Sequence, residues 1–140
     1  MNAASTIELI QNYYSAFNAN QDERLLQLLS DDVIHDINQG AREVGKQAFR
    51  EFLGRMRECY AEVITELTYC ASLDGSRAAA EYIVLGRYLN ADAGLPAASG
   101  QTYRLAGGAF FAVQDETITR VTNYYNLEDW LEQVRSPKLQ

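Results

Sequence analysis

The period of the hydrophobic pattern changes at about residue 62, and this change constrains the fold more than any other feature of the sequence. Before it, apolar residues recur every three or four positions, as amphipathic helices require. After it, apolar and polar residues alternate with the period of two that is typical of strands. A chain whose helices come first and whose strands follow is typical of the α+β class, with helices packed on one face of an antiparallel sheet.

Turn and capping residues divide this pattern into elements. The expected elements are helices over 5–18, 22–29, 46–59 and from Asn126 onward, a short strand over 33–38, and four long strands over 62–71, 78–89, 102–114 and 117–125. Ser5 and Glu8 form the capping box expected to begin the first helix. Asp74-Gly75 predicts a hairpin turn between the first two long strands. Residues 136–140 are expected to fray.

Composition and length set the broad class. The 140 residues suffice for one domain, 1–140, with a single core. The formal net charge of -7 disfavours nucleic acid and membrane surfaces as partners. Cys59 and Cys70 match no metal or redox spacing, so a reduced, cytoplasmic setting is expected. No apolar run approaches membrane-spanning length, and the start of the chain does not resemble a signal peptide.

The short strand holds the one histidine of the chain, His35, beside Asp36. Alternation puts His35 and Ile37 on one strand face and Asp36 on the other. On a cavity face, His35 is a candidate general base, because the pKa of imidazole lies near neutrality. The alternative is a buried neutral ring bonded to a backbone carbonyl. Asp36 is expected to bind backbone or an arginine such as Arg42 or Arg50, unless a one-residue bulge turns it inward.

Three segments resemble a known family: QNYYSAFNANQDERLLQLLSDDV, GAREVGKQAFREF and ITRVTNYYNLEDW. They are similar to the nuclear transport factor 2-like superfamily, and most closely to its ketosteroid isomerase-related and SnoaL-like polyketide cyclase branch. The resemblance implies a cone-shaped, curved antiparallel sheet packed against N-terminal helices, a cystatin-like roll with a hydrophobic pocket. It also implies a homodimer formed through the sheet and an enzyme that needs no cofactor.

The resemblance is partial at the catalytic positions. Tyr13 falls where the isomerases carry the tyrosine of their oxyanion hole, although the same residue could be a core tyrosine whose hydroxyl reaches water. Ile37 takes the place of the aspartate base, with Asp36 one residue earlier, and Gly108 takes the place of the protonated aspartate. In the cyclases an acidic base lies near Asn123, whose amide can orient a carbonyl but cannot take a proton. The steroid-isomerase set is therefore not retained.

The remaining candidates lie on the long strands and on the helices. Glu81 interrupts an apolar strand and either faces the cavity or pairs on the sheet with Arg104 or Arg120. Three phenylalanines complete the expected ligand site: Phe17, Phe52 and Phe110. One histidine and scattered carboxylates form no recognisable ligand set, so no metal is expected.

These observations lead to one main hypothesis. The chain is expected to be a small, cofactor-free enzyme of the isomerase or cyclase type that acts on an apolar carbonyl compound. His35 would move a proton, Tyr13 and Asn123 would hold the carbonyl oxygen, and Asp36 or Glu81 would orient the imidazole. The alternative is a non-catalytic module that binds a hydrophobic ligand or a partner. A third hypothesis is that the fold mainly serves dimerisation.

Overall fold

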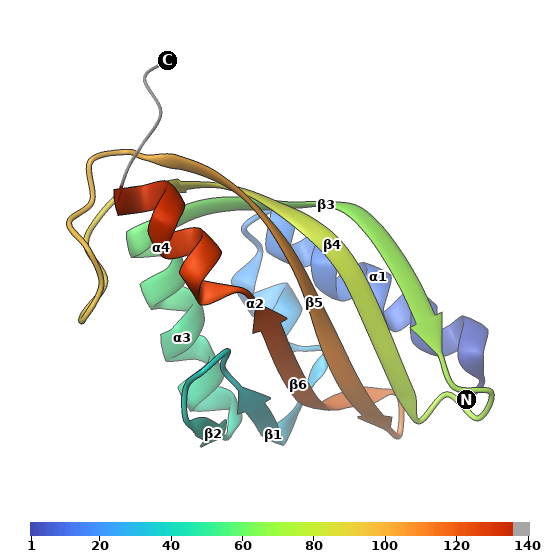
Figure 1. The fold of residues 1–140 in the computed structure, drawn as a ribbon. Helices are drawn as coiled ribbons and strands as arrows, with labels where there is room; N and C mark the ends of the chain where they lie inside the picture. The colour runs from blue at the N-terminus through green and yellow to red at the C-terminus, as the bar shows by residue number, and fades with distance from the viewer. Residues whose placement is uncertain (136–140) are drawn as a thin grey trace.

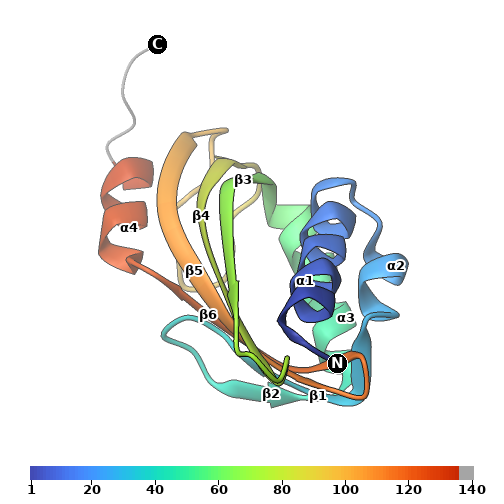
Figure 2. The same cartoon turned by 90° about the vertical axis from the view of Figure 1, so that its right-hand side faces the viewer.

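The computed structural model describes residues 1–135. Its elements are α1 (Ala3–Asn18), α2 (Asp22–Leu26), β1 (Leu29–Asp36), β2 (Arg42–Val44), α3 (Lys46–Cys59), β3 (Tyr60–Ala71), β4 (Arg77–Tyr88), β5 (Thr102–Gln114), β6 (Thr117–Tyr125) and α4 (Leu127–Arg135). The strands form one sheet in the order β2-β1-β6-β5-β4-β3. This sheet curves around α1 and α3, as Figures 1 and 2 show. The expected α+β class with a curved sheet against N-terminal helices is confirmed.

The sheet is mixed, and this differs from the all-antiparallel expectation. Strand β1 pairs with β6 in parallel, with His35 opposite Val121, while the pairs β3–β4, β4–β5 and β5–β6 are antiparallel. The short strand β2 lies between the short strand and the third helix expected from the sequence, and it pairs with β1 after a turn at Gln39-Gly40. Both pairings join residues whose local sequence carries no signal for the partner, so periodicity alone did not predict them.

The ends of the first two helices also differ from expectation. The capping box of α1 is formed by Asn2 and Ser5: Ser5 N donates to Asn2 Oδ1 at 2.9 Å, and Asn2 N donates to Ser5 Oγ at 3.1 Å. The helix therefore begins earlier than the Ser5–Glu8 pattern predicted. The second helix ends at Leu26, because Leu29 already belongs to β1 and pairs with Ile118.

A bulge in β3 decides which of its side chains face the helices. The register against β4 shifts between Thr65 and Thr68, and Glu66 has a φ of 52°. Before the bulge, Glu62 and Ile64 point inward; beyond it, inward residues have the opposite parity. Asn18 fixes this arrangement, because its amide donates to the Ile64 carbonyl at 2.9 Å and accepts from the Ile64 N–H at 2.8 Å. Uniform alternation along β3 was thus a wrong prediction.

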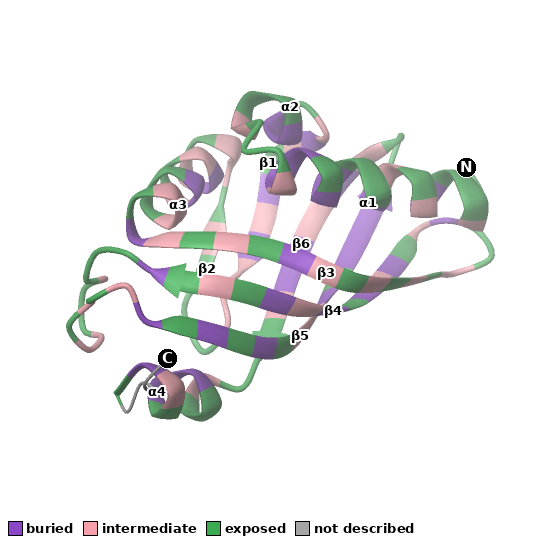
Figure 3. Ribbon diagram, turned by 90° about the horizontal axis from the view of Figure 1, so that it is seen from above, coloured by how far each residue is buried: buried purple, intermediate pink, exposed green. Residues whose placement is uncertain are grey.

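The core lies between the sheet and the helices. Seen from above, buried and exposed residues alternate along β4 and β5, so each strand has an inner and an outer face (Figure 3). Helix α4 packs along β5, and its Trp130 ring lies 5.1 Å from Tyr88, 5.9 Å from Tyr103 and 6.2 Å from Tyr60. The predicted cap of this helix is confirmed, since Asp129 N donates to Asn126 Oδ1 at 3.2 Å.

Two further expectations concern membrane-spanning segments and the last residues of the chain. None of the helices within residues 1–135 is long and apolar enough to cross a membrane. The fraying expected for 136–140 concerns a segment outside the described residues.

Candidate functional site

A cavity of about 310 Å³ lies between the inner face of the sheet and the helices. Its wall is built mainly from aromatic and aliphatic side chains of α1, α3, α4 and the central strands. Five polar or charged residues interrupt this apolar wall: Asn38, Arg55, Glu62, Asp92 and Asn123. An apolar hollow with a few polar groups is the usual form of a small-molecule site, and this volume lies at the lower end of the range of ~300–1,000 Å³ for such sites.

The structure places half of the sequence-predicted site residues in this wall. Those that line the cavity are Tyr13, Phe17, Ile37, Phe52 and Asn123. The other five, His35, Asp36, Glu81, Gly108 and Phe110, lie outside the lining. Gly108 pairs with Glu81 and Tyr124 on the outer face of the sheet, where Phe110 is 50% exposed. The alternation of β5 therefore turns Gly108 and Phe110 away from the helices.

His35 lies directly behind the cavity wall. Its side chain is buried, and the rings of Phe49 and Phe52 each lie 4.5 Å from the imidazole. Burial in this aromatic setting lowers the pKa of His35 to about 4, although Asp36 acts in the opposite direction. The imidazole is therefore neutral near pH 7.

Asn123 connects this buried ring to the cavity. Its amide nitrogen lies 3.0 Å from His35 Nε2, while Nδ1 has no hydrogen-bond partner among the described residues. With the Nδ1–H tautomer, the amide donates to Nε2 and turns its oxygen toward the cavity. With the Nε2–H tautomer, the amide is turned over and presents its NH₂ group. In both arrangements the histidine holds one end of the Asn123 amide and leaves the other end for a ligand.

Asp36 is engaged on the outside of this region. Its carboxylate accepts two hydrogen bonds from Arg42, at 2.6 and 3.1 Å, and one from Thr122 Oγ1 at 2.7 Å. The Arg42 guanidinium, together with Thr122, holds the pKa of this carboxyl below its usual range. The expected pairing of Asp36 with an arginine is confirmed. The other arginine considered, Arg50, binds Glu23 instead.

Glu62 is the cavity residue of chemical interest that the sequence analysis missed. The Tyr103 hydroxyl donates a hydrogen bond to Glu62 Oε2. Burial nevertheless raises the pKa of Glu62 above its ordinary value, because it outweighs this hydrogen bond and the charge of Arg57. The available signal was its parity with Ile64, but recognising it required knowledge of the bulge that follows.

Asp92 ties the loop between β4 and β5 to the rim of the cavity. Its Oδ2 accepts from the Tyr60 hydroxyl at 2.8 Å, and its Oδ1 lies 3.7 Å from Arg55. Next to it, Ala93 and Leu95 line the cavity from the same loop. The one arginine in the lining is thus already paired with an acid.

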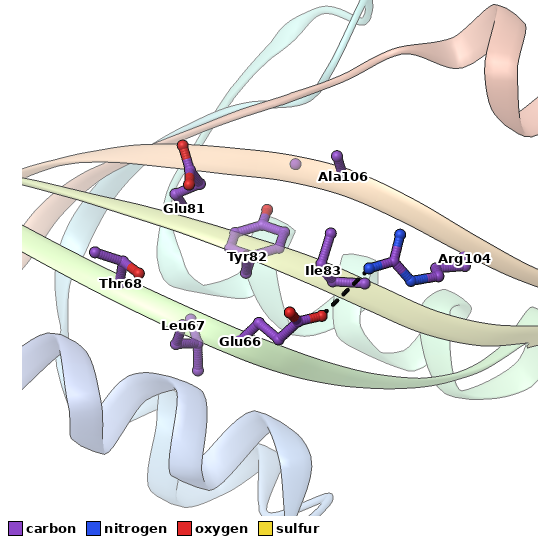
Figure 4. Close-up of a pocket in the computed structure, with 9 residues that line it drawn as sticks. Glu66, Leu67, Thr68, Glu81, Tyr82, Ile83, Arg104 and Ala106 are labelled. Carbon is purple, nitrogen blue, oxygen red and sulfur yellow. Dashed lines mark hydrogen bonds and ion pairs between the residues drawn. The ribbon is translucent and has the colours of Figure 1, made fainter.

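A second hollow, of about 710 Å³, lies on the outer face of the sheet (Figure 4). Glu81, Glu66 and Arg104 are among its lining residues, and all three are exposed. Arg104 lies 3.4 Å from Glu66, so the predicted partner of Glu81 is occupied by another acid. Because these groups are in contact with solvent, the hollow offers none of the desolvation found in the inner cavity.

Within residues 1–135, no cluster of three His, Cys, Asp or Glu side chains has a spacing that could hold a metal ion. The polar groups of the inner cavity are amides, phenols, carboxylates and one guanidinium. This set can bind a carbonyl oxygen and transfer protons.

Comparison with known proteins defines the family. The sequence profile of the SnoaL-like domain matches residues 10–121, and the chain belongs to this family, within the nuclear transport factor 2-like superfamily. A comparison with curated protein sequences gave no match.

Solved structures of high similarity cover almost the whole chain. A protein of Pseudomonas putida described as a candidate polyketide cyclase is 54% identical, with a TM-score of 0.92 over 92% of this chain and 97% of that one. Proteins with the same description from Xanthomonas campestris (50% identity, TM-score 0.93, 96% and 99% coverage) and from a Silicibacter species (45%, 0.93, 97% and 99%) are similar. An epoxide hydrolase from M. tuberculosis, 15% identical with a TM-score of 0.76, shares the fold alone.

Proposed function

We propose that this protein is a cofactor-free enzyme of the isomerase or cyclase type that acts on an apolar carbonyl compound in the inner cavity. The observation that carries the proposal is the apolar wall interrupted by few polar groups, of which Glu62 and Asn123 can serve proton transfer and oxygen binding. The description of its close structural relatives as candidate polyketide cyclases supports the same reaction class.

Tyr13 and Asn123 are the proposed holders of the carbonyl oxygen. Both side chains line the cavity, and burial raises the pKa of Tyr13, which keeps its phenol protonated as a donor. His35 acts through Asn123 in this proposal, since its ring is neutral and lies outside the lining. Asp36 has no role in the reaction, because Arg42 and Thr122 already occupy its carboxylate.

The test is turnover of enolisable ketones with one or two rings, followed by NMR, in a pair of loop variants. Ala93 is exposed and lines the cavity, whereas Ala91 is exposed on the same loop and does not. Ala93→Trp is expected to block ligand entry and abolish turnover, while Ala91→Trp retains it. Equal activity in the two variants would place the reaction elsewhere.

A non-catalytic binding module is the second candidate. The observation that favours it is the state of the predicted His–Asp pair, one member of which is neutral and buried while the other is bound to arginine. Under this alternative, ketones bind to the wild-type protein and to Ala91→Trp but not to Ala93→Trp. No α-proton of the bound ketone exchanges with solvent.

We also propose that the protein forms a homodimer through the outer face of the sheet. Four apolar side chains are exposed there, Val63 (48%), Leu85 (46%), Phe110 (50%) and Tyr124 (58%). Phe110→Glu is expected to give monomers in sedimentation experiments; a monomeric wild-type protein would contradict the proposal. The cytoplasmic setting inferred from cysteine usage stays a prediction.

A further inference from the structure

Glu62 is the carboxylate of the cavity wall to which, among residues 1–135, no cation is bound. The arginine whose charge reaches it, Arg57, lies 2.8 Å from Asp22 and donates to the Phe17 carbonyl at 2.9 Å. One carboxylate oxygen, Oε2, accepts from Tyr103. Within residues 1–135, the Tyr103 hydrogen bond is the one made to this carboxylate. The other oxygen is not among the fully buried atoms that lack a partner, so it is accessible to a ligand.

Tyr103 is fixed in place by its own neighbours. A Cβ on Gly86 would overlap the Tyr103 ring, so the ring lies across β4 where only glycine leaves room. The Trp130 ring also packs against it, edge to face, with the two centroids 5.9 Å apart. A phenol held in this way limits the rotamers open to Glu62 and directs its free oxygen.

We infer that Glu62 is the proton-transfer group of this cavity, with Tyr103 as its positioning residue, and that the substrate is an uncharged compound of one or two rings that carries a C–H bond next to a carbonyl. The inference rests on the proposed function and names the acid–base group and the substrate class of that site.

The chemical step needs no co-reactant. The Glu62 carboxylate takes the proton as the C–H bond breaks; the C–H electron pair forms the C=C bond of an enolate, and the carbonyl π pair moves to oxygen. The resulting carboxylic acid then returns the proton. In an isomerisation it returns to a different carbon. In a cyclisation the enolate carbon attacks a second carbonyl of the same molecule, and the proton goes to the alkoxide so formed.

The cavity itself argues for an uncharged, compact substrate. The cavity volume of about 310 Å³ leaves little room beyond two fused rings. Its arginine, Arg55, is already paired with Asp92, so an anionic substrate would meet two carboxylates and no free cation among the described lining residues. Rings of Tyr13, Tyr14 and Tyr82 in the wall suit a flat, apolar skeleton.

Titratable groups from four elements interact with Glu62. Arg57 on α3 and Tyr103 on β5 act on the pKa of Glu62, whereas the charge of Glu62 raises the pKa of Tyr82 on β4 and of Tyr125 on β6. Burial raises the pKa of Glu62, which makes its carboxylate a stronger base, while the Tyr103 hydroxyl and Arg57 lower that pKa. Removal of the Tyr103 hydroxyl should therefore raise the pKa of Glu62 further.

The experiment uses 2-tetralone, a two-ring ketone, and 2-naphthol, the aromatic analogue of its enolate. NMR in D₂O follows exchange of the tetralone α-protons, and fluorescence follows binding of naphthol. Glu62→Gln is expected to bind naphthol but to lose exchange by at least ~100-fold, as expected for loss of a general base. Glu66→Gln, a change on the outer face of the same strand, should exchange like the wild type. Tyr103→Phe should shift the pH profile of exchange to higher pH.

Each outcome separates the inference from the function on which it rests. Wild-type exchange that survives in Glu62→Gln overturns the role of Glu62 and leaves the proposed function intact. Binding of naphthol without exchange in the wild type overturns proton transfer by Glu62 and favours a binding module. Absence of binding overturns the proposed function and, with it, the inference.

A second measurement uses the wild-type protein without substrate. In protein labelled with ¹³C at glutamate carboxyls, the Glu62 resonance is expected to titrate above the ordinary glutamate pKa of about 4.3. A midpoint at or below that value would overturn the inference.

Discussion

Asn123 lies 3.0 Å from His35 Nε2 and separates the one histidine of the chain from the cavity. The Asn123 amide lines the cavity and the His35 imidazole does not, so His35 lies behind Asn123 as seen from the cavity. Because the ring is neutral and packed between Phe49 and Phe52, it can hold the amide in one plane. A residue expected to move protons is thus placed to orient a hydrogen-bonding group.

His35 makes stability depend on pH. Its pKa is about 4 in the folded protein against 6.5 ordinarily, so between these values the unfolded chain binds a proton that the folded chain does not. The stabilising effect is complete above pH 6.5 and is lost as the pH falls toward 4, by roughly 3 kcal/mol in total. Urea denaturation at several pH values should show this loss in the wild type. The profile of His35→Gln should lack it; parallel profiles would contradict the prediction.

Replacing Asn123 by aspartate should raise the pKa of His35. The change places a carboxylate at about hydrogen-bond distance from Nε2, where it favours the imidazolium ion. Because the chain has one histidine, its ring-proton NMR signal can be followed without assignment. The midpoint should move up from about 4 in Asn123→Asp. Asn126→Asp, at an exposed cap position, is the control and should leave the midpoint in place.

Two glycine-to-alanine changes should have opposite effects on stability. At Gly86 the new Cβ would overlap the Tyr103 ring, so Gly86→Ala should cost about 1–3 kcal/mol or more. At Gly54, in the middle of α3, nothing lies within 4 Å, and Gly54→Ala should stabilise by about 0.5–1 kcal/mol. Urea denaturation of both variants tests the pair. A neutral Gly86→Ala would mean that Tyr103 can leave its position.

Asp36→Asn should leave ligand turnover unchanged. The variant weakens the contacts with Arg42 and Thr122, but the carboxylate of Asp36 lies outside the cavity lining. Turnover of the ketone panel, compared with that of Glu62→Gln, measures the difference. A loss of activity as large as that of Glu62→Gln would mean that Asp36 takes part in the reaction.

Local sequence patterns predicted the parts of the site that depend on one element. Helical spacing put Phe17 and either Tyr13 or Tyr14 on the apolar side of α1, and the family resemblance singled out Tyr13. Strand alternation together with the resemblance placed Ile37 in the cavity wall. These orientations follow from the helix and strand periods, which the sequence displays directly.

Glu62 and His35 depend on contacts between elements. The inward orientation of Glu62 accompanies a bulge in β3, next to which Asn18 bonds to Ile64, 46 residues along the chain. The low pKa of His35 follows from burial against α3. No window of neighbouring residues contains either relationship, so alternation alone did not indicate that Glu62 faces the cavity.

The Asn18 contact also bears on how copies of this protein can associate. Strand β3 ends the sheet, and an end strand ordinarily offers free backbone groups to a strand of another chain. Here the side-chain amide of Asn18 already takes both the N–H and the carbonyl of Ile64. An incoming strand would find the Ile64 N–H and carbonyl already bonded to α1, so it could not form a continuous ladder of hydrogen bonds along this edge.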